Sequence, residues 1–233
     1  MGKRIISRAR GHGGPRYRAP GHRYAGAISY PREGAAKVID IIHDPARDAP
    51  LAVLEQADGS FRLTVAAEGI AVGDMLSIGQ KDAEARPGAI MPLSAVPKGS
   101  WVFGLESTPG SGPKLCTSAG TRALVVGHEP TKIILQMPSK QFKNLNPRCW
   151  ATVGMPAGGG AGDKPLIKAG QAYWASRARN RLWPRSSANK MNPVDHPFGG
   201  KTKPGTPKSI SRWAPPGAKV GSIAARRSGW RKK

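Results

Sequence analysis

The stretch KVIDIIHDPARDAPLAVLEQADGSFRLTV, residues 37–65, alternates short aliphatic and β-branched runs with turn residues. Short strands bounded by Pro, Gly and Asp are typical of a β-sandwich or a β-barrel. Asp58-Gly59 lies between the runs Leu51–Leu54 and Phe61–Val65, and an Asp-Gly pair in that position favours a tight hairpin turn. This stretch therefore predicts a small, mainly β domain.

The same alternation continues as far as residue 153. In chain order, the runs that we predict to be strands are Lys37–Ile42, Leu51–Leu54, Phe61–Val65, Met75–Ile78, Trp101–Glu106, Thr121–Val126, Lys132–Met137 and Trp150–Val153. Pro87, Pro92 and Pro97 separate the first set of runs from the second and predict a boundary between two small barrels. The Gly-rich segment 157–162 predicts a loop or linker. Residues 168–183 predict a charged helix that ends at Pro184.

The net charge of +23 is confined to the two ends of the chain. Residues 1–37 carry nine Lys/Arg and one acid, and residues 163–233 carry seventeen Lys/Arg and two acids, so the ends contribute +8 and +15. Residues 38–162 carry eleven of each sign and are neutral. Basic segments that are poor in apolar residues indicate a polyanion partner, and we expect them to become ordered only against such a partner.

Aromatic residues are interleaved with arginine in both basic ends. Residues 8–24, RARGHGGPRYRAPGHRY, combine Arg for phosphate, Gly for close backbone approach, and Tyr17, His22 and Tyr24 for stacking on unpaired bases. Four tryptophans lie among basic residues with little core to join, namely Trp174, Trp183, Trp213 and Trp230. This chemistry indicates a nucleic-acid interface, although composition alone is also compatible with a basic tail that has no specific partner.

Other classes of protein fit the sequence poorly. The start MGKRIISRAR lacks the apolar region of a secretory signal, and no apolar run reaches the roughly 18 residues of a membrane span. Cys116 and Cys149 lack CxxC spacing, and we predict buried thiols in a reducing compartment. The five histidines show no metal-binding spacing, so we expect no metal and no cofactor. Neither the glycines at 158–162 nor GGKT at 199–202 completes a nucleotide-binding motif.

Ordered motifs along the whole chain resemble the universal large-subunit ribosomal protein L2 family in its archaeal and eukaryotic form. They are RGHGGPRYRAPGHR, VIDIIHDPARDAPLA, EGIAVGD, KLCTSAGTRALVVGHE, NPRCWATVG, AGGGAGDKPLIKAG, MNPVDHPFGG and APPGAKVGSIAARRSG. The resemblance implies a mainly β fold with long irregular basic extensions. It implies a basic N-terminal rRNA-binding extension at 1–36, an OB-fold barrel at 37–86, an SH3-like barrel at 87–160, and a basic C-terminal extension with an interface loop at 161–233.

The resemblance also implies a function and a set of partners. The chain is expected to be a structural constituent of the large ribosomal subunit, a primary rRNA-binding protein that supports subunit association and the peptidyl transferase region in translation, and not an enzyme. The expected partners are large-subunit rRNA, neighbouring ribosomal proteins, and the small subunit through an intersubunit bridge. We expect a cytoplasmic, ribosomal location, no membrane association and no homo-oligomer.

The family's functional residues can be carried over where this sequence matches the motifs. The residues expected to bind rRNA are Arg8, Arg10, His12, Arg16, Tyr17, Arg18, His22, Arg23, Lys164, Lys168, Arg177, Arg179, Arg181, Lys190, Asn192, His196, Lys201, Arg212, Lys219, Arg226 and Arg227. The loop implied to lie near the peptidyl transferase region comprises Met191, Asn192, Pro193, Val194, Asp195, His196, Pro197, Phe198, Gly199 and Gly200. Because rRNA performs the chemistry at that centre, we expect His196 to contact RNA and not to catalyse.

Several residues depart from the family's usual pattern. Trp150 stands where Arg is frequent, Arg122 where an aromatic residue is frequent, and Lys201 where a third glycine is frequent, whereas Phe198 is normal for the archaeal and eukaryotic branch. Asp195 is an acid where phosphate is expected, so we predict that backbone N–H groups or a nearby Arg hold its carboxylate.

Two other functions remain open from the residues alone. An RNA-directed enzyme could use His196 and Asp195 as an acid–base pair, but it would need a water-excluding pocket with a tuned pKa. A free nucleic-acid chaperone would need only the basic ends. Comigration with large ribosomal subunits would favour the structural role over both.

Overall fold

The structure is a computed structural model that describes residues 2–31, 33–79, 85–201 and 209–226. The chain divides into two compact units. Both ends of the chain, residues 1–20 and 168–233, form one unit, which we call the basic unit. The continuous segment 21–167 forms the other, which we call the β unit.

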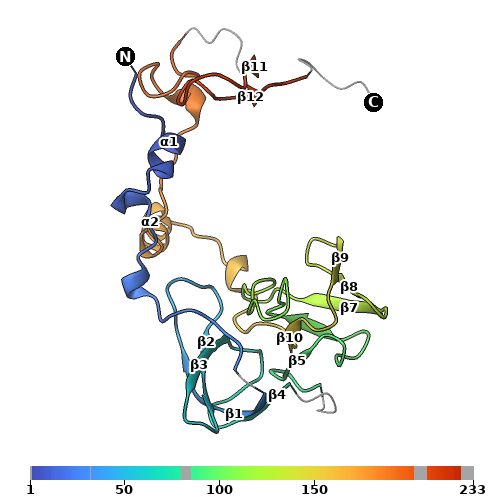
Figure 1. Ribbon diagram of the computed structural model, residues 1–233. Coiled ribbons are helices and arrows are strands. Elements are labelled where there is room, and N and C mark those ends of the chain that lie inside the picture. The colour runs from blue at the N-terminus through green and yellow to red at the C-terminus, as the bar shows by residue number, and fades with distance from the viewer. Residues whose placement is uncertain (1, 32, 80–84, 202–208, 227–233) are drawn as a thin grey trace. The chain divides into compact units, whose positions relative to one another are not determined.

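The β unit contains one continuous sheet. Its strands are β1 (Gly34–Ile42), β2 (Leu51–Gln56), β3 (Phe61–Val65), β4 (Met75–Ile78), β5 (Ile90–Pro92), β6 (Trp101–Phe103), β7 (Ala123–His128), β8 (Ile133–Gln136), β9 (Phe142–Leu145) and β10 (Trp150–Val153). The order across the sheet is β3-β2-β1-β4-β5-β10-β6-β7-β8-β9. Figure 1 labels all of these strands except β6. Neighbouring strands are antiparallel except β4 and β5, which pair in parallel where Ile78 meets Ile90.

Strands β1 to β4 form the first half of this sheet. The predicted hairpin is confirmed, because β2 and β3 pair antiparallel from Leu51 opposite Val65, and Gly59 takes the left-handed conformation that the turn needs (φ +74°). β1 pairs with both β2 and β4 and carries a bulge between Val38 and Asp40, a feature that bends a strand. A core of small and aliphatic side chains lies on its inner face: Ala36, Val38, Ala52, Leu54, Ala66, Leu76, Ile78 and Ile90.

Strands β5 to β10 enclose a second core. Its fully buried members include Met91, Leu93, Val102, Leu105 and Leu135. A third cluster, which contains Leu51, Val65 and Phe103, joins residues of both halves. The fold is mainly β, as predicted, and it has the arrangement of an OB-fold barrel followed by an SH3-like barrel. The domain boundaries at 36/37, 86/87 and 160/161 stay a prediction.

Several predicted boundaries are wrong in detail. The strand predicted to reach Glu106 ends at Phe103, and the strand predicted from Thr121 begins at Ala123. The proline-marked boundary contains a strand, β5, in which Pro92 is the last residue, and the Pro92 carbonyl accepts the Ala95 N–H in the turn that follows. Two 3-10 turns, η2 (Gly21–Arg23) and η3 (Ala161–Asp163), also lie in this unit, and the second overlaps the end of the predicted Gly-rich loop.

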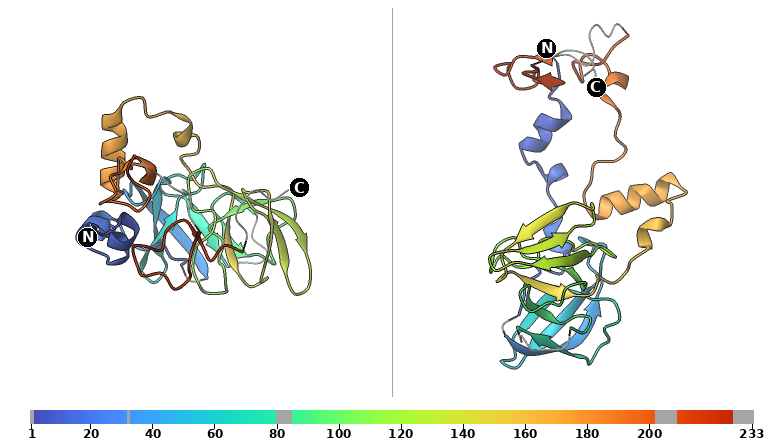
Figure 2. Two further views of the ribbon diagram at one scale, coloured as in Figure 1. Left: turned by 90° about the horizontal axis from the view of Figure 1, so that it is seen from above. Right: turned by 90° about the vertical axis from the view of Figure 1, so that its right-hand side faces the viewer.

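The basic unit has short elements and almost no core. Its elements are α1 (Ile6–Gly11), η1 (Pro15–Tyr17), α2 (Ala169–Ala178), η4 (Ala188–Lys190), β11 (Ser209–Ile210) and β12 (Ser222–Ile223). Helix α2 is shorter than the predicted helix at 168–183. Among the described residues of this unit, Ile5 is the one buried hydrophobic side chain, at 7% exposure. In both views of Figure 2 the N-terminal segment lies beside the C-terminal one.

Candidate nucleic-acid interface

Nearly all of the net charge belongs to the basic unit. Its sequence contains 22 Lys/Arg and one acid, Asp195, whereas the β unit contains 15 Lys/Arg and 13 acids. The two ends, which we predicted as separate extensions, therefore combine into a single body of charge +21. Such a body repels itself electrostatically and has little apolar burial to offset the repulsion, so a polyanion would stabilise it.

Two contacts near the N-terminus join the ends of the chain within the basic unit. The backbone N–H of Lys3 donates to the carbonyl oxygen of Val194 at 2.7 Å. The Arg8 guanidinium donates through Nη1 to the carbonyl oxygen of Pro216 at 3.3 Å. These bonds place the first residues of the chain against the C-terminal segment that contains the His196 loop.

A third contact lies at the end of α2, which is Ala169–Ala178. Asn180 donates through Nδ2 to the carbonyl oxygens of Pro15 and Arg18, at 3.0 and 2.7 Å. Its backbone is left-handed (φ +51°), a conformation that Asn tolerates better than most residues and that often ends helices. Sequence reasoning missed Asn180, because the predicted helix at 168–183 ran past it, although Asn is a recognisable signal for the C-terminal end of a helix.

The structure leaves most of the predicted rRNA-binding residues exposed. Tyr17, Arg179 and His196 are partly buried, and Arg227 lies outside the described residues. The exposed members are Arg8, Arg10, His12, Arg16, Arg18, His22, Arg23, Lys164, Lys168, Arg177, Arg181, Lys190, Asn192, Lys201, Arg212, Lys219 and Arg226. His22, Arg23 and Lys164 belong to the β unit, and the others belong to the basic unit.

The loop Met191–Gly200 closes on itself. Gly200 N–H donates to the Met191 carbonyl at 3.0 Å, and the N–H groups of Asp195 and His196 both donate to the Asn192 carbonyl, at 3.0 and 3.2 Å. These bonds fix the backbone without support from a sheet or a long helix. The loop therefore holds its shape through hydrogen bonds between its own residues.

Both glycines of this loop are required by its geometry. A Cβ atom at Gly199 would lie 2.4 Å from the Asn192 carbonyl oxygen, and this backbone atom has no room to move away. Gly200 has a φ of +99°, a backbone conformation that residues other than glycine rarely adopt. The two glycines thus allow the chain to turn tightly directly after Phe198.

His196 is held by its neighbour Phe198. The Phe198 N–H donates to Nδ1 of His196 at 3.0 Å, and the two rings meet edge-to-face with centroids 5.2 Å apart. Because Nδ1 accepts a hydrogen bond, the neutral imidazole carries its proton on Nε2. That N–H is a donor of the kind that binds a phosphate oxygen, a 2′-hydroxyl or a base acceptor.

The partner predicted for Asp195 is wrong in identity. We predicted backbone N–H groups or an arginine, whereas within the described residues its carboxylate lies 3.3 Å from Nζ of Lys3, a residue of the N-terminal end. The two side chains are 72% and 36% exposed, so the ion pair is largely solvated and contributes little to stability. Its consequence is positional, because it adds a second tie between Lys3 and the His196 loop. A cavity of about 540 Å³ beside this tie is lined by Lys3, Arg4, Arg8 and His196 among others.

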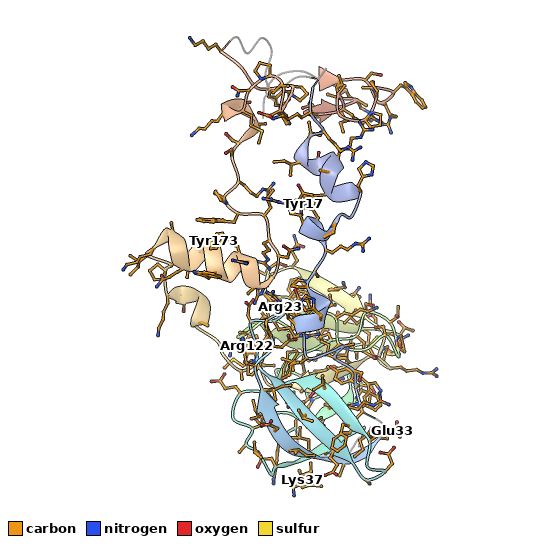
Figure 3. The ribbon with its side chains drawn as sticks, turned by 90° about the vertical axis from the view of Figure 1, so that its left-hand side faces the viewer. Tyr17, Arg23, Glu33, Lys37, Arg122 and Tyr173 are labelled. Carbon is orange, nitrogen blue, oxygen red and sulfur yellow. The ribbon has the colours of Figure 1, made fainter. Side chains whose placement is uncertain are left out.

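Two departures from the family pattern receive a structural account in the β unit. Trp150 is partly buried and packs on Tyr30 with ring centroids 6.2 Å apart, so packing replaces the charge that is usual there. The Arg122 guanidinium (Figure 3) lies over the ring of Trp101, 4.3 Å from its centroid. This cation–π pair places an aromatic ring at a position where the family often has an aromatic residue, but the ring belongs to Trp101 on β6.

A second cavity, of about 490 Å³, lies beside Tyr30, Glu106 and Trp150. Glu106 is 3% exposed, and its carboxylate accepts the N–H groups of Gly110, Gly112 and Trp150 at 3.1, 2.8 and 3.0 Å. Burial raises the pKa of the Tyr30 hydroxyl, which therefore stays protonated and donates to the Gly104 carbonyl. The polar groups here are occupied with holding loops, as expected of a structural site.

Asp44 is a further residue whose importance sequence reasoning missed. It is fully buried, and it accepts hydrogen bonds from the Ala46 N–H at 3.0 Å, from the Ala25 N–H at 3.5 Å and from the Arg47 guanidinium. Arg47 also donates to the Gly26 carbonyl at 3.1 Å. Burial alone would raise the pKa of Asp44, but these hydrogen bonds and the Arg47 charge lower it below its ordinary range. The pair fixes residues 25 and 26 to the first barrel.

The described residues contain neither a candidate metal-binding group nor a candidate membrane-spanning helix. No group of three or more His, Cys, Asp or Glu side chains in the described ranges is placed to hold a metal ion. No helix in the same ranges is long and apolar enough to cross a membrane. Both cysteines are free thiols, but Cys116 is only partly buried, so the prediction of two buried thiols is correct for Cys149 alone.

Comparison with known proteins identifies the family. The family model described as "Ribosomal Proteins L2, RNA binding N-terminal domain" matches residues 3–78, and the one described as "Ribosomal Proteins L2, C-terminal domain" matches residues 86–219. The chain belongs to the ribosomal protein L2 family. Members named "Large ribosomal subunit protein uL2" align with this L2-family chain over nearly its full length.

Three archaeal relatives show how close the L2 similarity is. The protein from Haloarcula marismortui is 46% identical, with 98% of each chain covered. The protein from Methanothrix thermoacetophila is 45% identical over 99% of this chain and all of its own. The protein from Methanothermobacter thermautotrophicus is 45% identical, with both chains fully covered. The resemblance to the archaeal form of the L2 family is thereby confirmed.

Proposed function

We propose that this L2-family chain is a structural constituent of the large ribosomal subunit and binds rRNA mainly through its basic unit. The observation that carries this proposal is the separation of charge: 22 Lys/Arg and one acid lie in a unit with almost no core. The relatives' names place them in the large ribosomal subunit, and one matched domain is described as RNA binding. The polyanion that the basic unit requires is then rRNA.

Binding follows from the electrostatics of the basic unit. Exposed Lys and Arg side chains replace the counterions condensed on the rRNA backbone, and release of those counterions drives association. The closed His196 loop presents Nε2–H as a donor to one RNA acceptor. The two barrels serve as a rigid body that enters the subunit together with the basic unit.

The finer features of the role also belong to this proposal. We place the chain in the cytoplasmic ribosome, where neighbouring ribosomal proteins are further partners. It contacts the small subunit through an intersubunit bridge and does not associate with copies of itself. The His196 loop is proposed to lie near the peptidyl transferase region. The role is structural and not catalytic, because His196 and Asp195 do not form a coupled pair: Asp195 pairs with Lys3, and Nδ1 of His196 accepts from Phe198.

Comigration with ribosomal subunits tests the proposal. A tagged copy of the full chain, expressed in an archaeal host, is expected to sediment with the large subunit and to stay there after a wash that removes loosely bound proteins. A free nucleic-acid chaperone would sediment near the top of the gradient or spread over many RNA species. That distribution would contradict the structural role.

A further inference from the structure

Helix α2 (Ala169–Ala178) contributes no residue to a hydrophobic core within the described part of the chain. None of its residues is buried, its N-cap residue Lys168 makes no side-chain cap bond, and its first turn has no acid. Isolated helices shorter than about 12–15 residues are marginal in water. A ten-residue helix of this kind requires a partner that covers one of its faces.

One face of α2 carries a compact group of two rings and one cation. Tyr173 and Trp174 meet edge-to-face with centroids 5.3 Å apart, and the Arg177 guanidinium lies over the Trp174 ring, 5.2 Å from its centroid. Arg177 also donates to the Tyr173 hydroxyl at 3.5 Å. Tyr173 and Trp174 are 42% and 63% exposed, and Figure 3 labels Tyr173 on the helix. We call Tyr173, Trp174 and Arg177 the α2 platform.

The charge around the platform selects the chemical class of its partner. From residue 164 to residue 194 the sequence has seven Lys/Arg and no acid. An anionic partner is therefore favoured, and the large exposed indole adds a requirement for a flat, stackable group. Single-stranded RNA meets both requirements, because each nucleotide offers a phosphate and a base with a π face.

We propose that the α2 platform binds an unpaired rRNA nucleotide: the base stacks on the exposed indole of Trp174, and Arg177, held over that ring, contacts the adjoining phosphate. This inference rests on the proposed function and makes it specific at one helix. Tyr173 is a positioning residue, since its ring edge and hydroxyl hold Trp174 and Arg177 in place. Covering this face with RNA also supplies the packing that α2 lacks in the free chain.

The test separates stacking from charge by the salt dependence of binding. The full chain and its variants are titrated with protein-free large-subunit rRNA at several salt concentrations. Trp174→Ala and Trp174→Leu remove the ring, and the second keeps helix propensity and apolar character, whereas Trp174→Phe keeps a stacking face. Arg177→Ala removes one cation. Phe142→Ala is the matched control, because Phe142 is also an exposed ring (65%) but lies on β9 of the β unit.

The expected pattern follows from the energies of the two interactions. Loss of one stacked base weakens binding about 5- to 150-fold. Trp174→Ala and Trp174→Leu should show this loss at every salt concentration, with an unchanged log–log salt slope. Trp174→Phe should retain most of the affinity, and Phe142→Ala all of it. Arg177→Ala should make the slope shallower by about 0.7 to 0.9.

Two results would overturn the α2 inference. Binding by Trp174→Leu that equals the original affinity would mean that the ring is not stacked. Equal losses in Trp174→Leu and Trp174→Phe would mean that the indole makes a shape-specific contact of another kind. Failure of the proposed function would look different, because then the unaltered chain would bind rRNA weakly and with little salt dependence. Thermal unfolding of the β unit, unchanged in every variant, verifies that this unit is folded in each protein.

Discussion

Replacing Asp44 by Asn is expected to destabilise the β unit strongly. The carboxylate of Asp44 is fully buried and accepts two backbone N–H groups and the Arg47 guanidinium. Asn keeps one acceptor oxygen but turns an amide N–H₂ toward Arg47, so a charge-assisted hydrogen bond becomes a contact between two donors. A hydrogen bond to a charged group contributes about 1.5–3 kcal/mol, and loss of one member of a buried ion pair costs about 3–5 kcal/mol.

The partial exposure of Arg47 reduces this cost. Its side chain is 22% exposed, so the unpaired guanidinium regains some hydration. We therefore expect a loss of about 2–4 kcal/mol in the free energy of unfolding. For a protein of this size, that loss lowers the Tm by about 5–15 °C. Differential scanning calorimetry or circular dichroism measures it, with Asp163→Asn as the control because Asp163 is exposed.

The same substitution has a pH signature. The pKa of Asp44 is lowered from its ordinary value of 3.8 in the folded state, so folding favours the charged form. Its stabilisation is fully present at pH values above that ordinary value and is lost as the pH falls through the lower folded pKa. The difference in Tm between the original protein and Asp44→Asn should therefore shrink below about pH 4. A difference under 1 °C at pH 7, or one that grows on acidification, would refute the reasoning.

Three further predictions concern the His196 loop and the two units. Gly199→Ala should prevent closure of the loop, since its Cβ would lie 2.4 Å from a backbone oxygen. Incorporation of the variant into large subunits in cells measures the effect. Gly162→Ala is the control and should incorporate normally, because its Cβ would meet no atom within 4 Å. Lys3→Ala should speed amide hydrogen exchange in residues 191–200 by no more than about 5-fold, because the exposed ion pair of Lys3 with Asp195 contributes at most about 1 kcal/mol, and it should leave the strands of the β unit unchanged. Equal exchange in both proteins would show that the Lys3 side chain does not hold the loop. A fragment of residues 21–167 should unfold cooperatively, because it contains all three core clusters; a gradual, non-cooperative transition would show that it depends on the basic unit.

The local pattern of apolar runs and turn residues was sufficient to predict many strands of the β unit. The strands Phe61–Val65, Met75–Ile78 and Trp150–Val153 were predicted with the bounds that the structure gives, because each is an apolar run between strong turn signals. β9 (Phe142–Leu145) was missed because its burial pattern has one buried residue, Leu145, and three exposed ones. Such a strand is specified by its pairing with β8 and carries little hydrophobic pattern of its own.

The candidate interface was predictable in composition but not in assembly. Charge and interleaved aromatics marked both ends of the chain as polyanion-binding, and that property is local. Nothing local indicated that Lys3 would pair with Asp195, or that Asn180 would bind the carbonyls of Pro15 and Arg18. These contacts join residues more than 160 positions apart. The sequence does not distinguish a Lys or Asn that makes such a contact from one that does not.

The salt dependence of rRNA binding by the isolated chain tests the central claim most directly. If about 8–15 of the cations contact phosphates, the plot of log affinity against log salt should have a slope between about −6 and −13. The fragment 21–167, whose sequence carries 15 Lys/Arg against 13 acids, should retain only a small part of that slope. A slope shallower than about −3 for the full chain, or an equal slope for the fragment, would contradict the claim that the basic unit binds the RNA.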